Sequence, residues 1–408
     1  MSKSNGRHPR NGTGNGNGAT APASPALHEG GTRTHVAIAP SKHVLITGGA
    51  GFIGANLAHR LLSHGKRVVL LDNLSRPGVE KNLRWLMETH GSLVDIEVPD
   101  IRNLAAVKSL VHGATQVFHL AAQVAVTSSL TSPIDDFEIN SRGTLNLLEA
   151  IRLATVPPSL VFTSTNKVYG SLNDLNFIRR GDRYEPRDEH LRNGINENRP
   201  LDFHSPYGCS KGAADQYVID YARTYKIPAV VFRMSCIYGP HQFGNEDQGW
   251  VAHLLRASVA GRPITIYGDG MQVRDILYVD DLIDAFLLAQ QNISLISGQA
   301  FNIGGGPVNT ISLLELMDLI AELHGGAQSL HFEEWRLADQ RYYVSNTAKF
   351  SSATGWKAKT NVRLGIRKLY EWILQDAASH STTRPLFDRP VATPSSVRQR
   401  FSEATGKV

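Results

Sequence analysis

From His43 onward, short apolar runs alternate with stretches in which apolar residues recur every three or four positions. The short runs predict buried strands, and the longer spacing predicts amphipathic helices. The predicted strands cover 43–47, 67–72, 93–98, 116–120 and 160–164, and the predicted helices cover 52–64, 79–90, 104–112 and 134–154. Regular alternation of strand and helix predicts a parallel sheet covered on both faces, which is a doubly wound α/β (Rossmann) architecture.

The rhythm breaks at 171–204, which is polar, contains Gly and Pro, and has weak periodicity. We interpret this stretch as an insertion. Beyond it, helices are predicted at 206–225, 248–260, 279–290, 311–324 and 364–374, and strands at 229–233, 264–267 and near Phe301. We therefore expect a Rossmann domain over 41–235 and a smaller α/β lobe over 236–375 for a substrate. Some segments of that lobe are expected to return to the first domain.

The two ends of the chain differ from its body in composition. Residues 1–40 are rich in Gly, Asn, Ser, Thr and Pro, so we expect a disordered tail, and 376–408 is expected to be an extended tail. The net charge of +5 lies entirely in these ends, because 1–40 carries +3 and 376–408 carries +2. The neutral body shows no basic stripe, so a nucleic-acid partner is not expected.

Composition also indicates the cellular compartment of the protein. The chain has no apolar run near the roughly 20 residues of a membrane span, and the N-terminal stretch lacks an apolar signal core. With only Cys209 and Cys236, a disulfide framework is not expected. The sequence thus predicts a cytoplasmic protein that does not contact a membrane.

Three glycines follow the first predicted strand and open the first predicted helix. Gly48, Gly51 and Gly54 enclose Phe52 and Ile53 in the spacing G-x-x-G-x-x-G. Missing side chains let the backbone turn tightly and approach a pyrophosphate, which the helix N-terminus then holds. The strand, turn and helix context predicts a dinucleotide-binding loop.

Polar residues at the second strand end bear on the choice of dinucleotide. Asp72 comes eighteen residues after Gly54 and is followed by Asn73, Ser75 and Arg76. A carboxylate there can accept both ribose hydroxyls of adenosine and repels a 2′-phosphate, which favours NAD. The nearby Arg76 leaves NADP open.

The next two strand ends extend the predicted cofactor site. Asp100 and Ile101 end the third strand and are expected to flank the adenine. Leu120, Ala121, Ala122 and Gln123 end the fourth strand, where small residues let a dinucleotide lie close.

A helix predicted from Pro206 carries the candidate chemistry. Tyr207 and Lys211 are four residues apart and therefore lie on one helical face. A tyrosine of ordinary pKa near 10 is a poor base, but a neighbouring cation and a cationic nicotinamide favour its phenolate. Thr165 follows the fifth strand, so its hydroxyl is expected beside Tyr207. These residues can take the proton of a sugar hydroxyl.

With these motifs the chain resembles the extended short-chain dehydrogenases/reductases of the nucleotide-sugar epimerase and dehydratase group. The resemblance implies bound NAD and a catalytic trio of Thr165, Tyr207 and Lys211. Tyr207 would be the base, Lys211 would bind the nicotinamide ribose and lower the tyrosine pKa, and Thr165 would orient the hydroxyl. Asn140 would help to shape the cofactor pocket.

Longer strings narrow the resemblance to 2-epimerases of CDP-linked deoxyhexoses. The strings are DNLSR at 72–76, STNKVYG at 164–170, LDFHSPYGCSKGAADQ at 201–216, DQGW at 247–250, QVRD at 272–275 and DQR at 339–341. Dehydratases of the group carry an Asp-Glu pair after the catalytic threonine, where this chain has Asn166 and Lys167. The 4-epimerases typically carry an aromatic-Asn pair where this chain has Ser235 and Cys236.

The resemblance implies transient oxidation of the sugar at C2, followed by return of the hydride to the other face. Arg274 and Arg341 are candidates for the substrate diphosphate, because a guanidinium fork matches phosphate oxygens. The other candidate substrate contacts are Thr165, Asn166, Lys167, Gln248 and Trp250. No metal is expected. The protein is expected to form a homo-oligomer, either a dimer or a tetramer.

The sequence leaves three alternatives open. The first is 2- or 4-epimerisation of another CDP-, UDP- or GDP-linked hexose. The second is 4,6-dehydration of a nucleotide sugar. The third is a NAD-binding scaffold without turnover.

Overall fold

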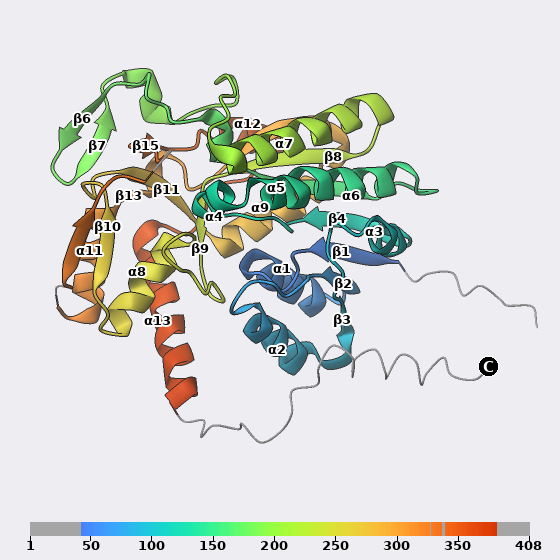
Figure 1. The fold of residues 1–408 in the computed structure, drawn as a ribbon, viewed down its shortest axis with the longest axis horizontal. Coiled ribbons are helices and arrows are strands. Elements are labelled where there is room, and N and C mark those ends of the chain that lie inside the picture. The colour runs from blue at the N-terminus through green and yellow to red at the C-terminus, as the bar shows by residue number, and fades with distance from the viewer. Residues whose placement is uncertain (1–41, 327, 337–338, 382–408) are drawn as a thin grey trace, which may run out of the picture. The chain divides into compact units, whose positions relative to one another are not determined.

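The computed structural model describes residues 42–326, 328–336 and 339–381 (Figure 1). Its central sheet has seven parallel strands in the order β12-β8-β5-β4-β1-β2-β3. These strands are β1 (His43–Thr47), β2 (Val68–Leu71), β3 (Val94–Glu97), β4 (Ala114–His119), β5 (Ser159–Thr165), β8 (Ala229–Met234) and β12 (Ala300–Ile303). The predicted tail 1–40 lies outside the described residues.

Two layers of helices cover this sheet, as its continuous apolar strands require. One face carries α1 (Phe52–Ser63), α2 (Val79–His90) and α9 (Val279–Gln291), and the other carries α3 (Leu104–Val111), α6 (Gly143–Arg152) and α7 (Ser205–Tyr225). The strand period sets this division: Val44 and Ile46 enter the first core, and Leu45 enters the second. Each such buried side chain contributes about 1.5–3 kcal/mol. The predicted doubly wound α/β fold is confirmed.

The strand order reverses between β1 and β4, which is where open sheets of this kind bind ligands. Thr47 at the end of β1 is level with Leu71 on β2 and with His119 on β4. Three strands therefore deliver their carboxyl ends to one crevice.

The helix predicted at 134–154 contains a local irregularity. After α4 (Val126–Thr131), the chain forms α5 (Pro133–Phe137), a π-helical turn over Glu138–Arg142, and then α6. Asn140 lies in the π turn, and its carbonyl accepts a hydrogen bond from the Thr144 hydroxyl at 2.6 Å. Periodicity alone does not reveal such a turn, because the apolar spacing shifts by only one residue.

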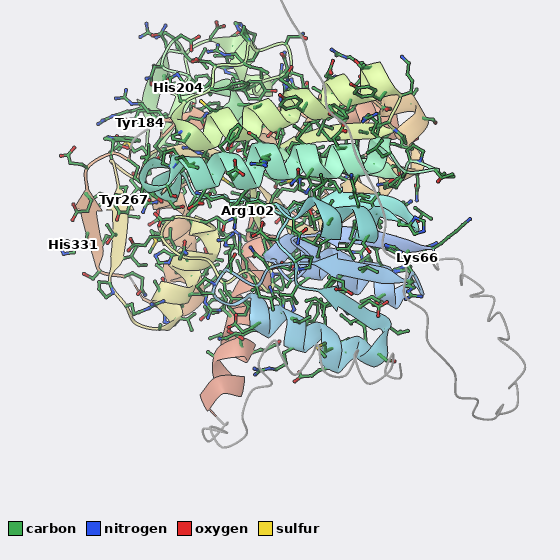
Figure 2. All side chains as sticks on the ribbon, turned by 45° about the vertical axis from the view of Figure 1, so that its right-hand side comes forward. Lys66, Arg102, Tyr184, His204, Tyr267 and His331 are labelled. Carbon is green, nitrogen blue, oxygen red and sulfur yellow. The ribbon has the colours of Figure 1, made fainter. Side chains whose placement is uncertain are left out.

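The C-terminal part of the chain adds two small sheets. One contains β9 (Cys236–Tyr238), β11 (Val273–Tyr278), β13 (Thr310–Ser312) and β15 (Tyr342–Tyr343), and the other pairs β10 (Ile264–Tyr267) with β14 (Leu330–Glu333). Figure 2 shows Tyr267 on β10 and His331 on β14. The packed helices here are α8 (Trp250–Val259), α11 (Leu313–His324) and α13 (Val362–Ser381), and α10 (Ile293–Ile296) and α12 (Ala348–Thr354) are shorter. The predicted boundary at 235 falls between β8 and β9.

The structure adds detail to one predicted segment and corrects another. The insertion 171–204 contains a hairpin of β6 (Phe177–Arg180) and β7 (Arg183–Pro186), and the amide of Ile195 bonds to the Val344 carbonyl at 2.7 Å. Buried Tyr169, Leu172 and Tyr343 pack with Ile195, which explains why this polar stretch is folded. Helix α13 continues to Ser381, so the extended tail predicted from 376 is wrong over its first six residues. Residues 382–408 lie outside the described chain.

Candidate active site

A cavity of about 640 Å³ lies along the carboxyl ends of β1, β2, β4 and β5. Its size suits a small-molecule ligand. The lining contains most of the predicted site residues: Gly48, Gly51, Phe52, Ile53, Gly54, Asp72, Asn73, Ser75, Arg76, Asp100, Ile101, Leu120, Ala121, Ala122, Gln123, Thr165, Asn166, Tyr207, Lys211, Gln248 and Trp250. Four predicted residues do not line it: Asn140, Lys167, Arg274 and Arg341.

The glycine loop needs glycine at two positions for different reasons. Gly48 has a φ of +70°, and a Cβ there would lie 2.7 Å from the Ala121 nitrogen. A Cβ at Gly54 would lie 2.2 Å from the Gly48 carbonyl oxygen. The loop thus packs against both the β4 end and α1, which leaves the helix N-terminus facing the cavity.

Asp72 holds the glycine loop from the end of β2. One carboxylate oxygen accepts the amide of Ala50 at 3.0 Å, and the other accepts the amide of Leu74 at 2.9 Å. Burial raises the pKa of Asp72, and these backbone hydrogen bonds oppose that shift. Each oxygen keeps acceptor capacity for a ribose hydroxyl.

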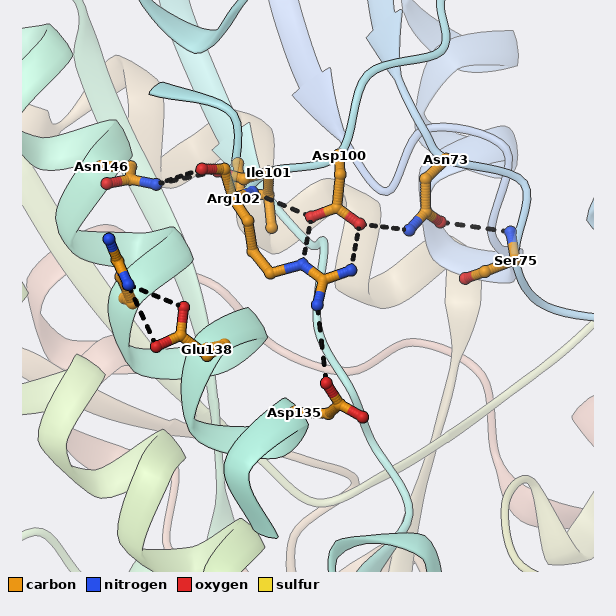
Figure 3. A network of polar contacts seen from close by, with 9 residues as sticks. Asn73, Ser75, Asp100, Ile101, Arg102, Asp135, Glu138 and Asn146 are labelled. Atoms are coloured by element: carbon orange, nitrogen blue, oxygen red, sulfur yellow. Dashed lines mark hydrogen bonds and ion pairs between the residues drawn. The ribbon is translucent and has the colours of Figure 1, made fainter. Parts of the chain in front are cut away.

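The end of β3 is fixed by a local ion pair (Figure 3). Arg102 donates from Nε and Nη2 to the two oxygens of Asp100 at 2.9 and 3.0 Å, and Asn73 donates to Asp100 at 2.8 Å. The hydrogen bonds from Arg102 lower the pKa of Asp100 to about 2. Asp100 is therefore ionised at neutral pH and sets the position of Asn73.

A buried histidine connects the ends of β1 and β4. His119 bonds through Nδ1 to the Thr47 hydroxyl at 2.6 Å and through Nε2 to the Thr144 hydroxyl at 3.0 Å. Burial, with a smaller effect of Lys211, lowers the pKa of His119 to about 3. The imidazole ring is therefore neutral at physiological pH, and it connects the Thr47 and Thr144 hydroxyls. Sequence reasoning missed it because His119 reads there as part of a strand.

Tyr207 reaches the cavity from the first turn of α7, where Pro206 occupies an early helical position. The phenol is buried and hydrogen-bonds with the Thr165 hydroxyl at the end of β5. Burial raises the pKa of Tyr207 to about 12, although the Thr165 bond opposes the shift. The expected lowering of this pKa is therefore absent in the protein alone.

Lys211 lies one turn further along α7. Its Nζ donates to the Thr163 carbonyl at 2.7 Å and lies 4.4 Å from the centre of the Phe162 ring. Burial lowers the pKa of Lys211 to about 7, and Asp215 and Asp136 oppose that shift. The nearby carboxylates therefore do not offset the cost of burying the Lys211 ammonium, and additional negative charge in the cavity would favour its protonated form.

Asn140 acts behind the cavity lining. Its Oδ1 accepts the Gln123 amide at 2.9 Å, and its Nδ2 donates to the Gln123 carbonyl at 3.0 Å and to Ser210 Oγ at 3.0 Å. Ser210 in turn donates to the buried carboxylate of Asp136. This network ties the π turn to α7 beside Tyr207. The sequence analysis named Asn140, whose contribution to the cofactor pocket stays a prediction, and did not name Asp136 or Ser210.

The two predicted phosphate-binding arginines lie outside the cavity lining. Arg274 Nη2 donates to Asp339 at 2.7 Å, and Lys167 Nζ lies 3.7 Å from the same carboxylate oxygen. Arg341 is exposed, and its guanidinium lies 5.8 Å from the ring centres of Tyr184 and Trp335. Long-range pairing with Asp339 was not visible from spacing.

Three buried oxygens in the lining have no protein hydrogen-bond partner among the described residues. They are Asn82 Oδ1, Ser164 Oγ and Gln242 Oε1. Such atoms are costly unless a ligand or water satisfies them. Together with the glycine loop and Asp72, they fit a polar dinucleotide. The sequence could have indicated Asn82, because it is a polar residue on the same helical face as the apolar Val79 and Leu86.

Two further features are absent from the described residues. No helix there combines the length and apolar character needed to cross a bilayer. No three His, Cys, Asp or Glu side chains in that part of the chain are grouped so as to hold a metal ion.

The fold and the site agree with a sequence comparison. A sequence profile of the NAD dependent epimerase/dehydratase family matches residues 44–304, and the chain belongs to that family. Its cofactor is NAD, as Asp72 predicts.

Three relatives place the chain within the family. It is 45% identical to CDP-paratose 2-epimerase of Salmonella typhi over 338 residues, which covers 81% of this chain and 98% of the relative. It is 31% identical to a probable dTDP-glucose 4,6-dehydratase of Sinorhizobium fredii, over 82% of this chain and 93% of that protein. The solved UDP-glucose 4-epimerase of Thermus thermophilus, in complex with NAD, matches with a TM-score of 0.67 at 31% identity, over 81% of this chain and 99% of that one.

Proposed function

We propose that this protein inverts C2 of a CDP-linked deoxyhexose and converts CDP-paratose to CDP-tyvelose. The observation that carries the proposal is the 45% identity to CDP-paratose 2-epimerase over 98% of that protein. The arrangement of Thr165, Tyr207 and Lys211 around one cavity supports the chemistry.

In this proposal, the chain supplies the acid and base, and NAD accepts and returns a hydride. Tyr207 Oη takes the proton of the C2 hydroxyl as the sugar is oxidised and returns it after the ketone has presented its other face. Thr165 orients that hydroxyl. Burial raises the pKa of Tyr207 to about 12 in the protein alone, so the positive charge of the oxidised cofactor and of Lys211 would favour the phenolate.

The residues after Thr165 favour epimerisation over dehydration. The side-chain amide of Asn166 donates to Gln340 Oε1 at 3.3 Å, and Lys167 pairs with Asp339. An amide and a paired ammonium do not offer a carboxylate and a carboxylic acid for the loss of water.

Proton NMR of the purified protein with CDP-paratose tests the proposal. We expect the C2 epimer to accumulate to equilibrium without net NADH formation. UDP-glucose and dTDP-glucose serve as parallel substrates. Exclusive turnover of UDP-glucose would indicate a 4-epimerase, a 4-keto-6-deoxy product would indicate a dehydratase, and binding of NAD without turnover of any sugar would indicate a scaffold.

We also propose a homo-oligomer that forms through α5 and α7. Ile134 and Phe137 on α5 are 77% and 53% exposed, and Tyr217 on α7 is 44% exposed. Large exposed apolar side chains on two helices that contact each other are typical of an interface. Light scattering is expected to show a dimer or tetramer that Ile134→Glu weakens.

We place the reaction in the cytoplasm. Both cysteines, Cys209 and Cys236, are free thiols, which suits a reducing compartment. Fractionation of cells that express the protein is expected to recover it with the cytoplasmic enzymes.

A further inference from the structure

A segment that crosses the cavity connects the two halves of the site. We call residues 239–249 the strap. The strap follows β9 and leads into α8, and its residues 241–245 and 247–249 contribute to the cavity lining. It faces the glycine loop and the loop after β2.

The base of the strap is fastened to the cofactor half by side-chain amides. Asn56 on α1 donates to the Pro240 carbonyl at 3.0 Å. Asn82 on α2 donates to the His241 carbonyl at 3.2 Å and to the Ala50 carbonyl of the glycine loop at 3.1 Å. One asparagine thus joins the strap to the loop expected to hold the pyrophosphate.

Aromatic stacking fixes the same end. The ring of His241 stacks on Trp85 of α2 at 3.7 Å between centroids and lies 5.1 Å from the ring of Trp372 on α13. A Cβ on Gly78 would lie 2.8 Å from Phe243, so the loop after β2 packs directly on the strap. This end of the strap is therefore packed against α2, the loop after β2 and α13.

The tip of the strap is held from the opposite side. Tyr267 donates to the Glu246 carboxylate at 3.2 Å, and Arg336 Nη1 donates to the Glu246 carbonyl at 2.6 Å. One side-chain hydrogen bond reaches back across the cavity, from Arg76 Nη2 to Gln248 Oε1. Both of these residues line the cavity.

We propose that the strap, closed by the bond between Arg76 and Gln248, retains the dinucleotide in the cavity. The biological reason rests on the proposed epimerisation, because reduced cofactor lost after the first hydride transfer would leave a keto sugar that cannot be reduced. Arg76 is the single arginine in the lining formed by the described residues. Its guanidinium has five N–H donors, so the bond to Gln248 leaves others for anionic oxygens of the ligand.

The test measures dissociation of NADH from the preloaded protein without sugar, by fluorescence after a chase with excess NAD. A hydrogen bond to a charged group predicts about 10-fold faster release for Gln248→Leu and for Arg76→Met. Gln248→Glu would place a carboxylate beside the guanidinium, and slower release than from the wild type is expected. Gln299→Leu, outside the cavity lining, serves as the matched control.

The double variant of Arg76 and Gln248 decides whether the two residues act together. Release no faster than from either single variant is expected. Multiplied effects, or unchanged release from Gln248→Leu and Gln248→Glu, would overturn the proposal. Gln248 is only half-buried, so these two variants keep the test valid if Arg76→Met does not fold. Because this assay contains no sugar, its failure is separate from failure of the substrate assignment, which the NMR assay reports.

Discussion

The two ends of the cavity are built in different ways. At the cofactor end, backbone amides and neighbours along the chain fix the groups: Asp72 accepts the amide of Leu74, and Asp100 pairs with Arg102. At the sugar end, side chains from distant segments meet, as in the bond from Asn166 to Gln340, 174 residues further along. The residues that line the cofactor end are therefore carried mainly by short motifs, although Asn82 also joins that end to the distant His241, whereas the sugar end depends on contacts between distant segments.

The sharpest test of this contrast removes the chemistry and spares the cofactor end. Tyr207→Phe is expected to reduce kcat by about 10²–10⁴-fold, because the base is lost, while NAD binds as before. Turnover by NMR and NAD titration measure the two effects. Tyr217→Phe, an exposed tyrosine on the same helix, is the control. Wild-type turnover by Tyr207→Phe would contradict the assignment.

The converse change damages the cofactor end through the backbone. Gly54→Ala places a Cβ 2.2 Å from the Gly48 carbonyl oxygen, so the loop must shift. We expect NAD affinity to fall at least about 10-fold and stability to fall by about 1–3 kcal/mol. Calorimetric titration and thermal unfolding check both.

Gly326→Ala provides the matched control for that change, since a Cβ there meets no atom within 4 Å. Equal NAD affinity in the two alanine variants would show that close packing of the loop is not what forms the cofactor site.

At the sugar end, the long-range pairing itself can be broken. Asp339→Asn removes the charge shared by Arg274 and Lys167, and a loss of about 1–3 kcal/mol in unfolding free energy is expected. Denaturant unfolding measures it, and NAD affinity should stay constant. Glu322→Gln, in an exposed pair with Arg363, should change stability by less than about 0.5 kcal/mol. Equal losses of unfolding free energy in Asp339→Asn and Glu322→Gln would contradict the claim that the pairing of Asp339 stabilises the sugar end.

The last effect is a change in the slope of stability against pH, and it concerns a group between the two ends. Burial lowers the pKa of Lys211 to about 7, so above that pH the native state has lost a proton that the unfolded chain keeps up to about pH 10.5. The unfolded state binds more protons in this window, and stability therefore rises with pH, by at most about 1.4 kcal/mol per unit.

Lys211→Met is expected to lose this contribution to the slope, as measured by denaturant unfolding at pH 7, 8 and 9. Parallel slopes for the variant and the wild type would mean that the ammonium is not destabilised by its surroundings.

The same contrast explains what the sequence could predict. The strand at 43–47 and the helix at 79–90 follow from local pattern and are confirmed, and the glycines from Gly48 to Gly54 lie at the junction of β1 and α1 and line the cavity. Strand β11 was missed because buried Arg274 and Asp275 interrupt its apolar run. Spacing marks an arginine as a phosphate ligand without revealing that a carboxylate 65 residues away already binds it.

The place of Trp372 has a practical consequence for shortened forms of the protein. Every residue of the cavity lining precedes position 252, so a chain cut before α13 would keep all of them. It would nevertheless lose Trp372, whose indole contacts the ring of His241. Such a fragment should retain each recognisable motif and yet hold its dinucleotide loosely, so expression designs should extend through Ser381.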